Sequence, residues 1–116
     1  MAKAAAIKAD FIGMDASGAA KVVNFASEAL GGLDILVNNA GIIHREASTQ
    51  MPMDEWRRVL SVNLDSVWLL CQAAGQRMVA QGSGKIIIVS SVLGTQGGLR
   101  VPAYTASKHS VIGLTR

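Results

Sequence analysis

The chain has 116 residues, of which 50% are hydrophobic and 16% are charged, and its formal net charge is +3. This balance is typical of a single globular domain and excludes a disordered or fibrous protein. The basic residues are scattered without interleaved aromatics, so the charge gives no support for nucleic-acid binding. The sequence also shows no metal-ligand pattern and no apolar run long enough to span a membrane.

The single cysteine and the first residues bear on the cellular compartment. Cys71 is the only cysteine, so no internal disulfide is expected. Its place in an apolar helical pattern predicts a buried thiol in a reducing compartment. Lys8 and Asp10 interrupt the apolar residues near the start, so a signal peptide is not expected. We therefore expect a cytoplasmic protein.

The first two expected elements are a strand and a helix. Residues 10–14 (DFIGM) form a short apolar run that predicts a strand, and Asp15 follows at its carboxyl end. Between residues 17 and 30 the apolar side chains recur at helical spacing, and the pair Gly31-Gly32 marks the end of that helix.

Two further apolar runs, at 33–37 (LDILV) and 85–89 (KIIIV), predict strands that are buried on both faces. Between them Pro52 begins a long helix, for which Pro is a favourable first residue. The apolar stripe of that helix consists of Trp56, Val59, Leu60, Val67, Leu70, Cys71, Ala74 and Met78. A glycine-containing loop then leads from the last strand to a helix that carries Tyr104.

The alternation of strand and helix predicts an α/β fold with a doubly wound parallel sheet. In such sheets ligands bind beyond the carboxyl ends of the strands. The residues at those ends are Asp15, Asn38 to Gly41 (NNAG), and the pair Ser90-Ser91. All are polar or small, as a binding crevice requires.

Tyr104 and Lys108 lie four residues apart, so in a helix they share one face. A neighbouring ammonium favours the phenolate form, which would let Tyr104 give and take a proton. Ser91 precedes Tyr104 by 13 residues, a spacing that lets its hydroxyl return to the phenol and hold a substrate oxygen. The alternative is a Tyr and a Lys on a solvated helix face, with Ser90 or Ser91 capping a turn.

Three other positions have both a functional and a structural interpretation. Asn63 falls on the buried stripe of the long helix, and a buried amide needs partners. It is either a satisfied core residue or the anchor of a water at the site. The NNAG segment either lets a ligand approach the backbone or forms a tight turn. Asp15 either faces a ligand or caps the helix that follows it.

The segments DILVNNAG, VNL, IIIVSS and YTASK occur in this order, and through them the chain resembles the short-chain dehydrogenase/reductase family along essentially its whole length. The resemblance implies a Rossmann-type fold. It also implies hydride transfer between a nicotinamide cofactor (NAD, with NADP as the alternative) and a secondary alcohol or ketone. The implied catalytic residues are Asn63, Ser91, Tyr104 and Lys108, and the implied cofactor-binding residues are Asp15, Asn39, Ala40, Gly41, Tyr104 and Lys108.

Within these implied roles, Asn63 would hold a proton-relay water and Lys108 would also bind the nicotinamide ribose. Asp15 would contact the adenine, and residues 39–41 would line the adenosine pocket. Ser91 and Arg100 would contact the substrate.

The stretches NNAGIIHRE and QGGLRVPAYTASK resemble the sugar-acid branch of the family, typified by 2-deoxy-D-gluconate 3-dehydrogenase and its 3-deoxy-ketogluconate relatives. Arg100, His44 and Arg45 would supply positive charge to a substrate carboxylate. Their alternative is an exposed or subunit-contacting role. Within the family, a 3-oxoacyl-carrier-protein reductase-like activity is the competing expectation.

The resemblance also implies that residues 1–116 form one incomplete domain. The family's glycine-rich TGxxxGxG turn and its NAD-or-NADP selecting residue are not in this sequence. The three strands would then be the third, fourth and fifth of the family's sheet. We expect residues 10–14 to detach or pair in a non-native way, and residues 33–37 to expose an apolar edge. We also expect residues 1–116 by themselves to be catalytically inactive, and the alternative function is an inactive fragment or a partner-binding module.

In the intact family, the helices carrying Asn63 and Tyr104 form the main subunit contact, usually in tetramers. Trp68, Leu69 and Val111 are the candidates for such a contact here. Their alternative is simple core packing.

Overall fold

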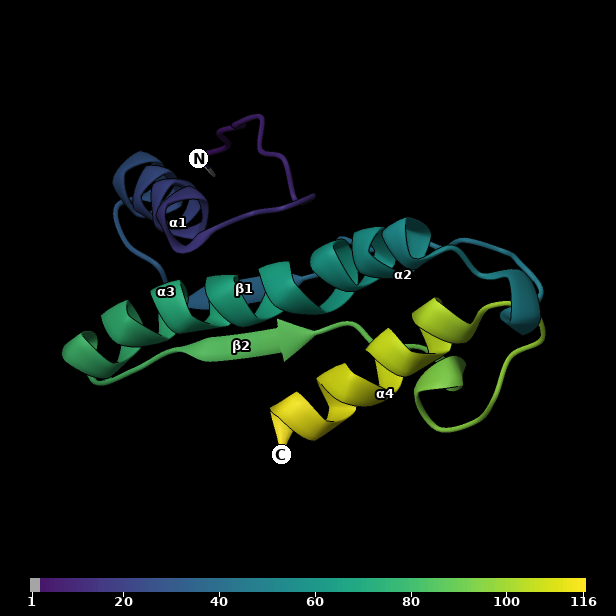
Figure 1. The fold of residues 1–116 in the computed structure, drawn as a ribbon. Helices are drawn as coiled ribbons and strands as arrows, with labels where there is room; N and C mark the ends of the chain where they lie inside the picture. Colours follow the sequence, from purple (N-terminus) through teal and green to yellow (C-terminus); the bar gives the residue numbers. More distant parts are fainter. Residues whose placement is uncertain (1–2) are drawn as a thin grey trace.

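The computed structural model describes residues 3–116. Its helices and strands alternate along the chain, and α2, η2 and α3 form one continuous helical segment (Figure 1). The elements are α1 (Ala16–Leu30), β1 (Ile35–Asn38), the short 3-10 helix η1 (Ser48–Gln50), α2 (Met53–Leu60), the π-helical turn η2 (Ser61–Asp65), α3 (Ser66–Gln81), β2 (Lys85–Ile88), the 3-10 helix η3 (Val92–Gly94) and α4 (Pro102–Thr115).

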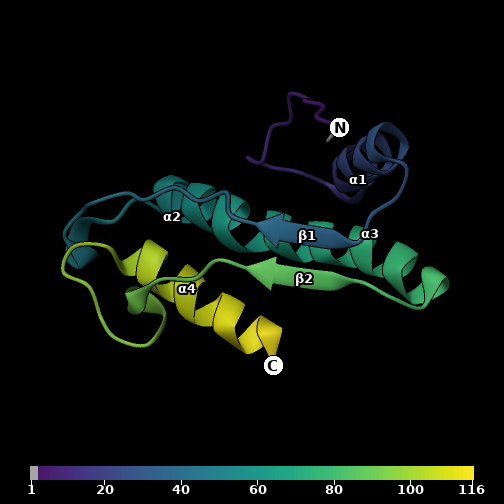
Figure 2. The same cartoon turned by 180° about the vertical axis from the view of Figure 1, so that it is seen from behind.

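Strands β1 and β2 pair in parallel, with Ile35 opposite Lys85 and Asn38 opposite Ile88. Helix α3 connects them and packs on one face of the sheet, whereas the opposite face is open in the view from behind (Figure 2). Three apolar side chains on the open face are half exposed or more: Ile35 at 59%, Val37 at 54% and Ile87 at 50%. The prediction that both strands are buried on both faces is therefore wrong. Residues 33–37 were expected to expose an apolar edge: β1 pairs with β2 alone, so its other edge has no strand beside it, and its exposed apolar side chains lie on the open face.

Residues 10–14 do not form the predicted strand. The Asp10 carboxylate accepts a hydrogen bond from the Ile12 amide at 2.9 Å, which favours a turn. Gly13 has a φ of 66°, and its amide donates to the Ser61 hydroxyl at 2.7 Å. A strand needs a hydrogen-bonded neighbour, and residues 10–14 pair with neither β1 nor β2. Of the two expected outcomes, the segment has detached.

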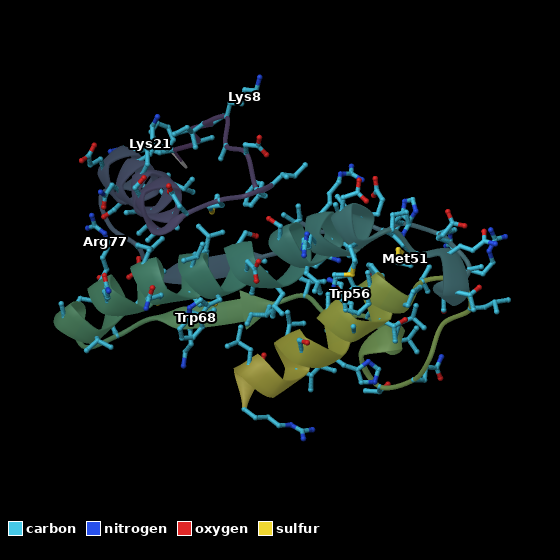
Figure 3. All side chains as sticks on the ribbon, viewed as in Figure 1. Lys8, Lys21, Met51, Trp56, Trp68 and Arg77 are labelled. Atoms are coloured by element: carbon cyan, nitrogen blue, oxygen red, sulfur yellow. The ribbon has the colours of Figure 1, made fainter. Side chains whose placement is uncertain are left out.

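The predicted helix over residues 17–30 is confirmed as α1, and Gly31 ends it in the left-handed conformation. Its buried Ala19 and Val23 pack against α3, so the two helices share one apolar core. The Arg77 side chain reaches from α3 toward α1, where its guanidinium donates to Asn24 and Ser27 (Figure 3). The core consists of Ala19, Val23, Leu33, Leu70, Ala74 and Met78.

The candidate contact residues for a partner subunit differ in exposure. Trp68 is 50% exposed on α3 (Figure 3). Leu69 packs against the shared core of α1 and α3. Val111 is only 1% exposed, so its expected outward position is wrong and the alternative of core packing is confirmed. Its position on α4 faces inward because that helix packs on α2 and η2.

Among residues 3–116, no helix combines the length and the apolar character that crossing a bilayer requires.

Asp15 provides a pH-dependent cap for α1. Hydrogen bonds from the Gly18 amide and, next, the Ser17 hydroxyl lower the pKa of its carboxyl, because both stabilise the charged form. The cap is therefore present above the carboxyl's unfolded pKa and is lost as the pH falls through the folded value. We expect the Gly18 amide proton resonance to shift during an acid titration followed by NMR. Asp15→Asn, which keeps a capping oxygen, should abolish that shift, whereas Asp54→Asn should not. An unchanged titration in Asp15→Asn would contradict the assignment.

Candidate functional site

The carboxyl ends of β1 and β2 border a cavity of about 350 Å³. The parallel register places Asn38 opposite Ile88, so the chain leaves both strands at the same level of the sheet. Helix α4 supplies the remaining wall. The lining residues are Asn39, Gly41, Ile42, Ile43, Val89, Ser90, Tyr104 and Lys108. The prediction of a crevice at this edge of the sheet is confirmed for β1 and β2, and Asp15 is not among its lining residues.

Lys108 is the charged group of the cavity, and it is only 5% exposed. Its ammonium donates to the Val89 carbonyl at 2.9 Å and lies 5.5 Å from the centre of the Tyr104 ring. A buried ammonium needs such partners because desolvation destabilises the charge. Tyr104 is half-buried on the same helix. The prediction that these two side chains lie side by side on one helix face is therefore confirmed.

Asn63 lies in the π-helical turn η2 and is 1% exposed. Its Oδ1 accepts from the Ile42 amide at 2.8 Å, and its Nδ2 donates to the Ile42 carbonyl at 2.9 Å and to the Ser107 hydroxyl at 3.1 Å. Both amide hydrogens are thus used within the protein. Of the two interpretations offered by the sequence, these bonds match that of a satisfied core residue. The π-helical turn itself was not predicted.

The two adjacent serines after β2 have different partners. The Ser90 hydroxyl donates to the Lys108 carbonyl at 3.0 Å and so joins the strand end to α4. The Ser91 hydroxyl accepts from the Leu93 amide at 3.2 Å and caps η3, as the structural alternative expected. Ser91 is half-buried and does not line the cavity described above. Its contact with a substrate stays a prediction.

Of the remaining residues expected to bind the cofactor, some line the cavity and others do not. Asn39 and Gly41 line the cavity, whereas Ala40 between them is exposed and does not. A Cβ at Gly41 would lie 3.6 Å from Asn63 Oδ1 and 3.7 Å from Lys108 Nζ, so the bare backbone here leaves room beside both groups. Asp15 caps α1, and its expected contact with adenine stays a prediction.

His44 is placed between two carboxylates. Its Nδ1 lies 3.4 Å from Glu55 Oε2 and its Nε2 lies 3.9 Å from Glu46 Oε2. Arg58 also contacts Glu55, at 3.2 Å. Acidic neighbours on both sides make His44 a poor source of free positive charge for an anionic substrate, in contrast to our expectation.

Arg100 and Arg45 are exposed, as a role in binding a substrate carboxylate requires. Arg100 has a φ of 61°, which is the left-handed region that non-glycine residues rarely adopt. Its carbonyl accepts from the Glu46 amide at 2.9 Å, so the loop before α4 is tied to the loop after β1. Such conformations persist where the surrounding structure holds them, often at functional sites.

Cys71 is half-buried, whereas the sequence predicted a buried thiol. Burial raises the pKa of the Cys71 thiol, and a hydrogen bond from Asn38 Nδ2 at 3.2 Å opposes that rise. The thiol therefore belongs to the packing of α3 on β1. Within the described part of the chain, no group of three or more His, Cys, Asp or Glu side chains is placed to hold a metal ion.

Sequence reasoning missed Ser107 and left Ser90 among the turn-capping residues. Ser107 is fully buried, and its hydroxyl donates to the Tyr104 carbonyl at 2.7 Å while it accepts from Asn63. The position of this serine one turn after Tyr104 could have indicated a role near the site, because a hydroxyl on the inward face of a helix needs hydrogen-bond partners. The identity of those partners depends on how α4 crosses η2.

A cavity at the ends of parallel strands, with a Tyr and a buried Lys on one helix, defines a Rossmann-like α/β protein. The sequence profile described as short chain dehydrogenase matches residues 1–116. The chain belongs to this family.

Relatives within the family are named for sugar acids. The chain is 58% identical over 84 residues to the 2-dehydro-3-deoxy-D-gluconate 5-dehydrogenase of Bacillus subtilis, which covers 72% of this chain and 33% of that protein. A crystal structure from Beutenbergia cavernae, of a protein provisionally named an NAD(P)-dependent gluconate 5-dehydrogenase and holding NADP at low occupancy, superposes with a TM-score of 0.86 at 46% identity. That match covers 97% of this chain and 44% of the other.

The gluconate 5-dehydrogenase of Burkholderia cenocepacia, solved with NADP and tartrate, gives a TM-score of 0.82 at 35% identity. The match covers 87% of this chain and 40% of that one. Across these three relatives, the chain thus spans between 33% and 44% of the relative's length. All three are named as 5-dehydrogenases rather than as the expected 2-deoxy-D-gluconate 3-dehydrogenase, whereas the Bacillus subtilis relative is named for a 3-deoxy-ketogluconate, the other substrate type expected from the sequence.

Gly94 sets how closely η3 approaches α4. A Cβ at this position would lie 2.5 Å from Ser90 Oγ, 2.7 Å from Ile112 Cδ1 and 3.0 Å from the Lys108 carbonyl oxygen. We expect Gly94→Ala to push α4 away from the strand end and to lower the free energy of unfolding by about 1–3 kcal/mol. Gly97→Ala is the matched control, because a Cβ there meets nothing within 4 Å. Urea unfolding measures both, and equal midpoints would show that the contact tolerates a methyl group.

Proposed function

We propose that this chain carries the proton-transfer and nicotinamide-binding part of an NAD(P)-dependent oxidoreductase that interconverts an alcohol and a ketone on a sugar acid. The observation that carries the proposal is the buried Lys108 ammonium, held at 2.9 Å by the Val89 carbonyl beside the Tyr104 ring. Both side chains line a cavity whose other walls include Asn39 and Gly41. Family membership and the names of the relatives support the same activity.

The residues of the cavity fit a nicotinamide nucleoside. An ammonium has three N–H donors, and Lys108 uses one of them on Val89, which leaves two for the ribose hydroxyls. Gly41 keeps the space beside Lys108 Nζ free of a side chain. When bound, the nicotinamide supplies or accepts the hydride. The relatives' structures hold NADP, so we propose that NADP is used as well as NAD.

The proton is moved by this chain's own residues. In the reduction direction, the Tyr104 phenol donates its proton to the substrate oxygen, and the neighbouring Lys108 ammonium stabilises the phenolate that forms. Ser91 is not among the residues that line the cavity, but its hydroxyl accepts from the Leu93 amide and so retains a hydrogen to donate; we propose that it donates this hydrogen to the same substrate oxygen and orients it. Because both amide hydrogens of Asn63 are already used, we assign its side chain to holding the site together rather than to binding a relay water.

We propose a sugar acid oxidised at its C5 position as the substrate class, because the relatives described above are named for that reaction. Arg100 and Arg45 supply the positive charge for the substrate carboxylate, and both are exposed. His44 has no such role, since it faces Glu55 and Glu46. The tartrate in the Burkholderia cenocepacia structure is a hydroxy acid, which matches a site for carboxylates and hydroxyls.

Removal of the Lys108 ammonium tests the cofactor site. We expect Lys108→Met to weaken NADPH binding at least tenfold, because a buried cationic donor is lost. Quenching of the fluorescence of Trp56 and Trp68 provides the readout. Lys85→Met removes the same charge from an exposed position on β2 and should leave the affinity unchanged. Equal affinity in Lys108→Met and the unmodified chain would refute the assignment.

Removal of the Arg100 side chain tests the substrate class. With NADP present, we expect Arg100→Ala to weaken gluconate binding about ten- to a hundredfold, which is the range for losing a charged hydrogen bond. Arg116→Ala, which removes an exposed charge at the end of α4, is the control. Calorimetric titration measures both. If gluconate binds both variants equally well, the carboxylate partner is not Arg100, and Arg45 remains the candidate. If gluconate does not bind even the unmodified chain, a neutral 3-oxoacyl substrate gains support.

A further inference from the structure

Ser107 links the two helical segments that carry the site. Its side chain is fully buried in α4, where the hydroxyl hydrogen is donated to the Tyr104 carbonyl one turn earlier, at 2.7 Å. The same oxygen accepts a hydrogen from Asn63 Nδ2 at 3.1 Å. One hydroxyl therefore joins the backbone beneath Tyr104 to the π-helical turn η2.

The link continues from Asn63 into the cavity wall. The Asn63 amide accepts from the Ile42 N–H at 2.8 Å and donates to the Ile42 carbonyl at 2.9 Å. Ile42 and its neighbours Gly41 and Ile43 line the cavity together with Tyr104 and Lys108, and a Cβ on Gly41 would lie 3.7 Å from Lys108 Nζ. An unbroken path of hydrogen bonds thus runs from Ile42 through Asn63 and Ser107 to the Tyr104 carbonyl on α4.

The donors and acceptors in this path leave only one role for the Ser107 hydroxyl, which is to accept a hydrogen from Asn63. Asn63 can satisfy Ile42 only with its oxygen toward the Ile42 N–H and its NH₂ toward the Ile42 carbonyl. The second amide hydrogen then points at Ser107, which must accept it because its own hydrogen is used on Tyr104. Without that acceptor, a buried N–H is left unpaired, which destabilises this arrangement of the Asn63 amide.

We propose that Ser107 is a positioning residue for the site assigned above: its hydroxyl fixes the Asn63 amide and thereby the placement of residues 41–43 relative to Tyr104 and Lys108. The proposal rests on the proposed function, since it gives Ser107 its role in that same cavity. Ser107 touches neither the substrate nor the cofactor. It acts through Asn63 on the wall and through the Tyr104 carbonyl on α4.

The test compares Ser107→Ala with Ser110→Ala in the 116-residue chain labelled with ¹⁵N. Ser110 is the matched control because its hydroxyl also bonds within α4, to the Ala106 carbonyl at 2.8 Å, but from an exposed position. We expect Ser107→Ala to accelerate hydrogen exchange of the Asn63 side-chain amide and of the Ile42 backbone amide at least tenfold. Ser110→Ala should change neither rate. Ser107→Thr retains the hydroxyl and should restore slow exchange at Asn63.

Unchanged exchange at both Asn63 and Ile42 in Ser107→Ala would overturn the proposal, as would equal acceleration in Ser110→Ala. If Ser107→Ala does not fold, Ser107→Cys replaces the hydroxyl by a thiol, which is a weaker acceptor, and should accelerate the same two exchange rates. NADPH affinity, read from tryptophan fluorescence, should fall at least threefold in Ser107→Ala. The exchange rates need no cofactor, so a chain that fails to bind NADPH but shows the Ser107-dependent rates contradicts the proposed function alone.

Discussion

The buried amide of Asn63 is the constraint on which the geometry of the site depends. It lies in a π-helical turn, a feature that occurs often at functional sites, and it bonds to the loop after β1 and to α4. Burying an amide without its partners is costly, so the loss of one of these contacts weakens the others. By bonding to Ile42 and to Ser107, the amide holds the loop after β1 and helix α4 in a fixed relative position at the cavity.

The end of β2 supplies the second constraint. The Val89 N–H continues the ladder to the Asn38 carbonyl at 2.9 Å, whereas the Val89 carbonyl accepts from Lys108. A strand end therefore stabilises a buried ammonium with a backbone group that the sheet no longer uses. Ser90, the next residue, fixes the backbone of Lys108 itself, and Gly94 permits that close approach. The residues that end β2 are thus the same residues that hold the buried ammonium and the backbone of Lys108.

Features that depend on neighbours along the chain were predictable from the sequence. Helical periodicity predicted α1, the apolar stripe of α3 and the burial of Asn63. The spacing of Tyr104 and Lys108 predicted that they share one helix face. Features that depend on distant neighbours were not. Residues 10–14 have the composition of a strand but no partner, and the open sheet face exposes Val37.

The same distinction holds for individual contacts. The bond between Asn63 and Ser107 joins residues 44 positions apart, and periodicity carries no information on that pairing. His44 meets Glu55 only because the loop after β1 folds back onto α2. Val111 faces inward because of the way α4 packs, which its apolar character alone does not decide.

The parallel pairing of β1 and β2 restricts where residues can be inserted into or deleted from the chain. Asn38 lies opposite Ile88, and one added residue in either strand would turn every following side chain to the other face. Asn39 or Ser90 would then leave the cavity. The stretch from Thr95 to Gly97 is exposed, and Gly97 has no neighbours within 4 Å of a Cβ, so added residues are accommodated there. Insertions and deletions among proteins related to this one should therefore occur in that loop, whereas the number of residues in each strand should stay the same.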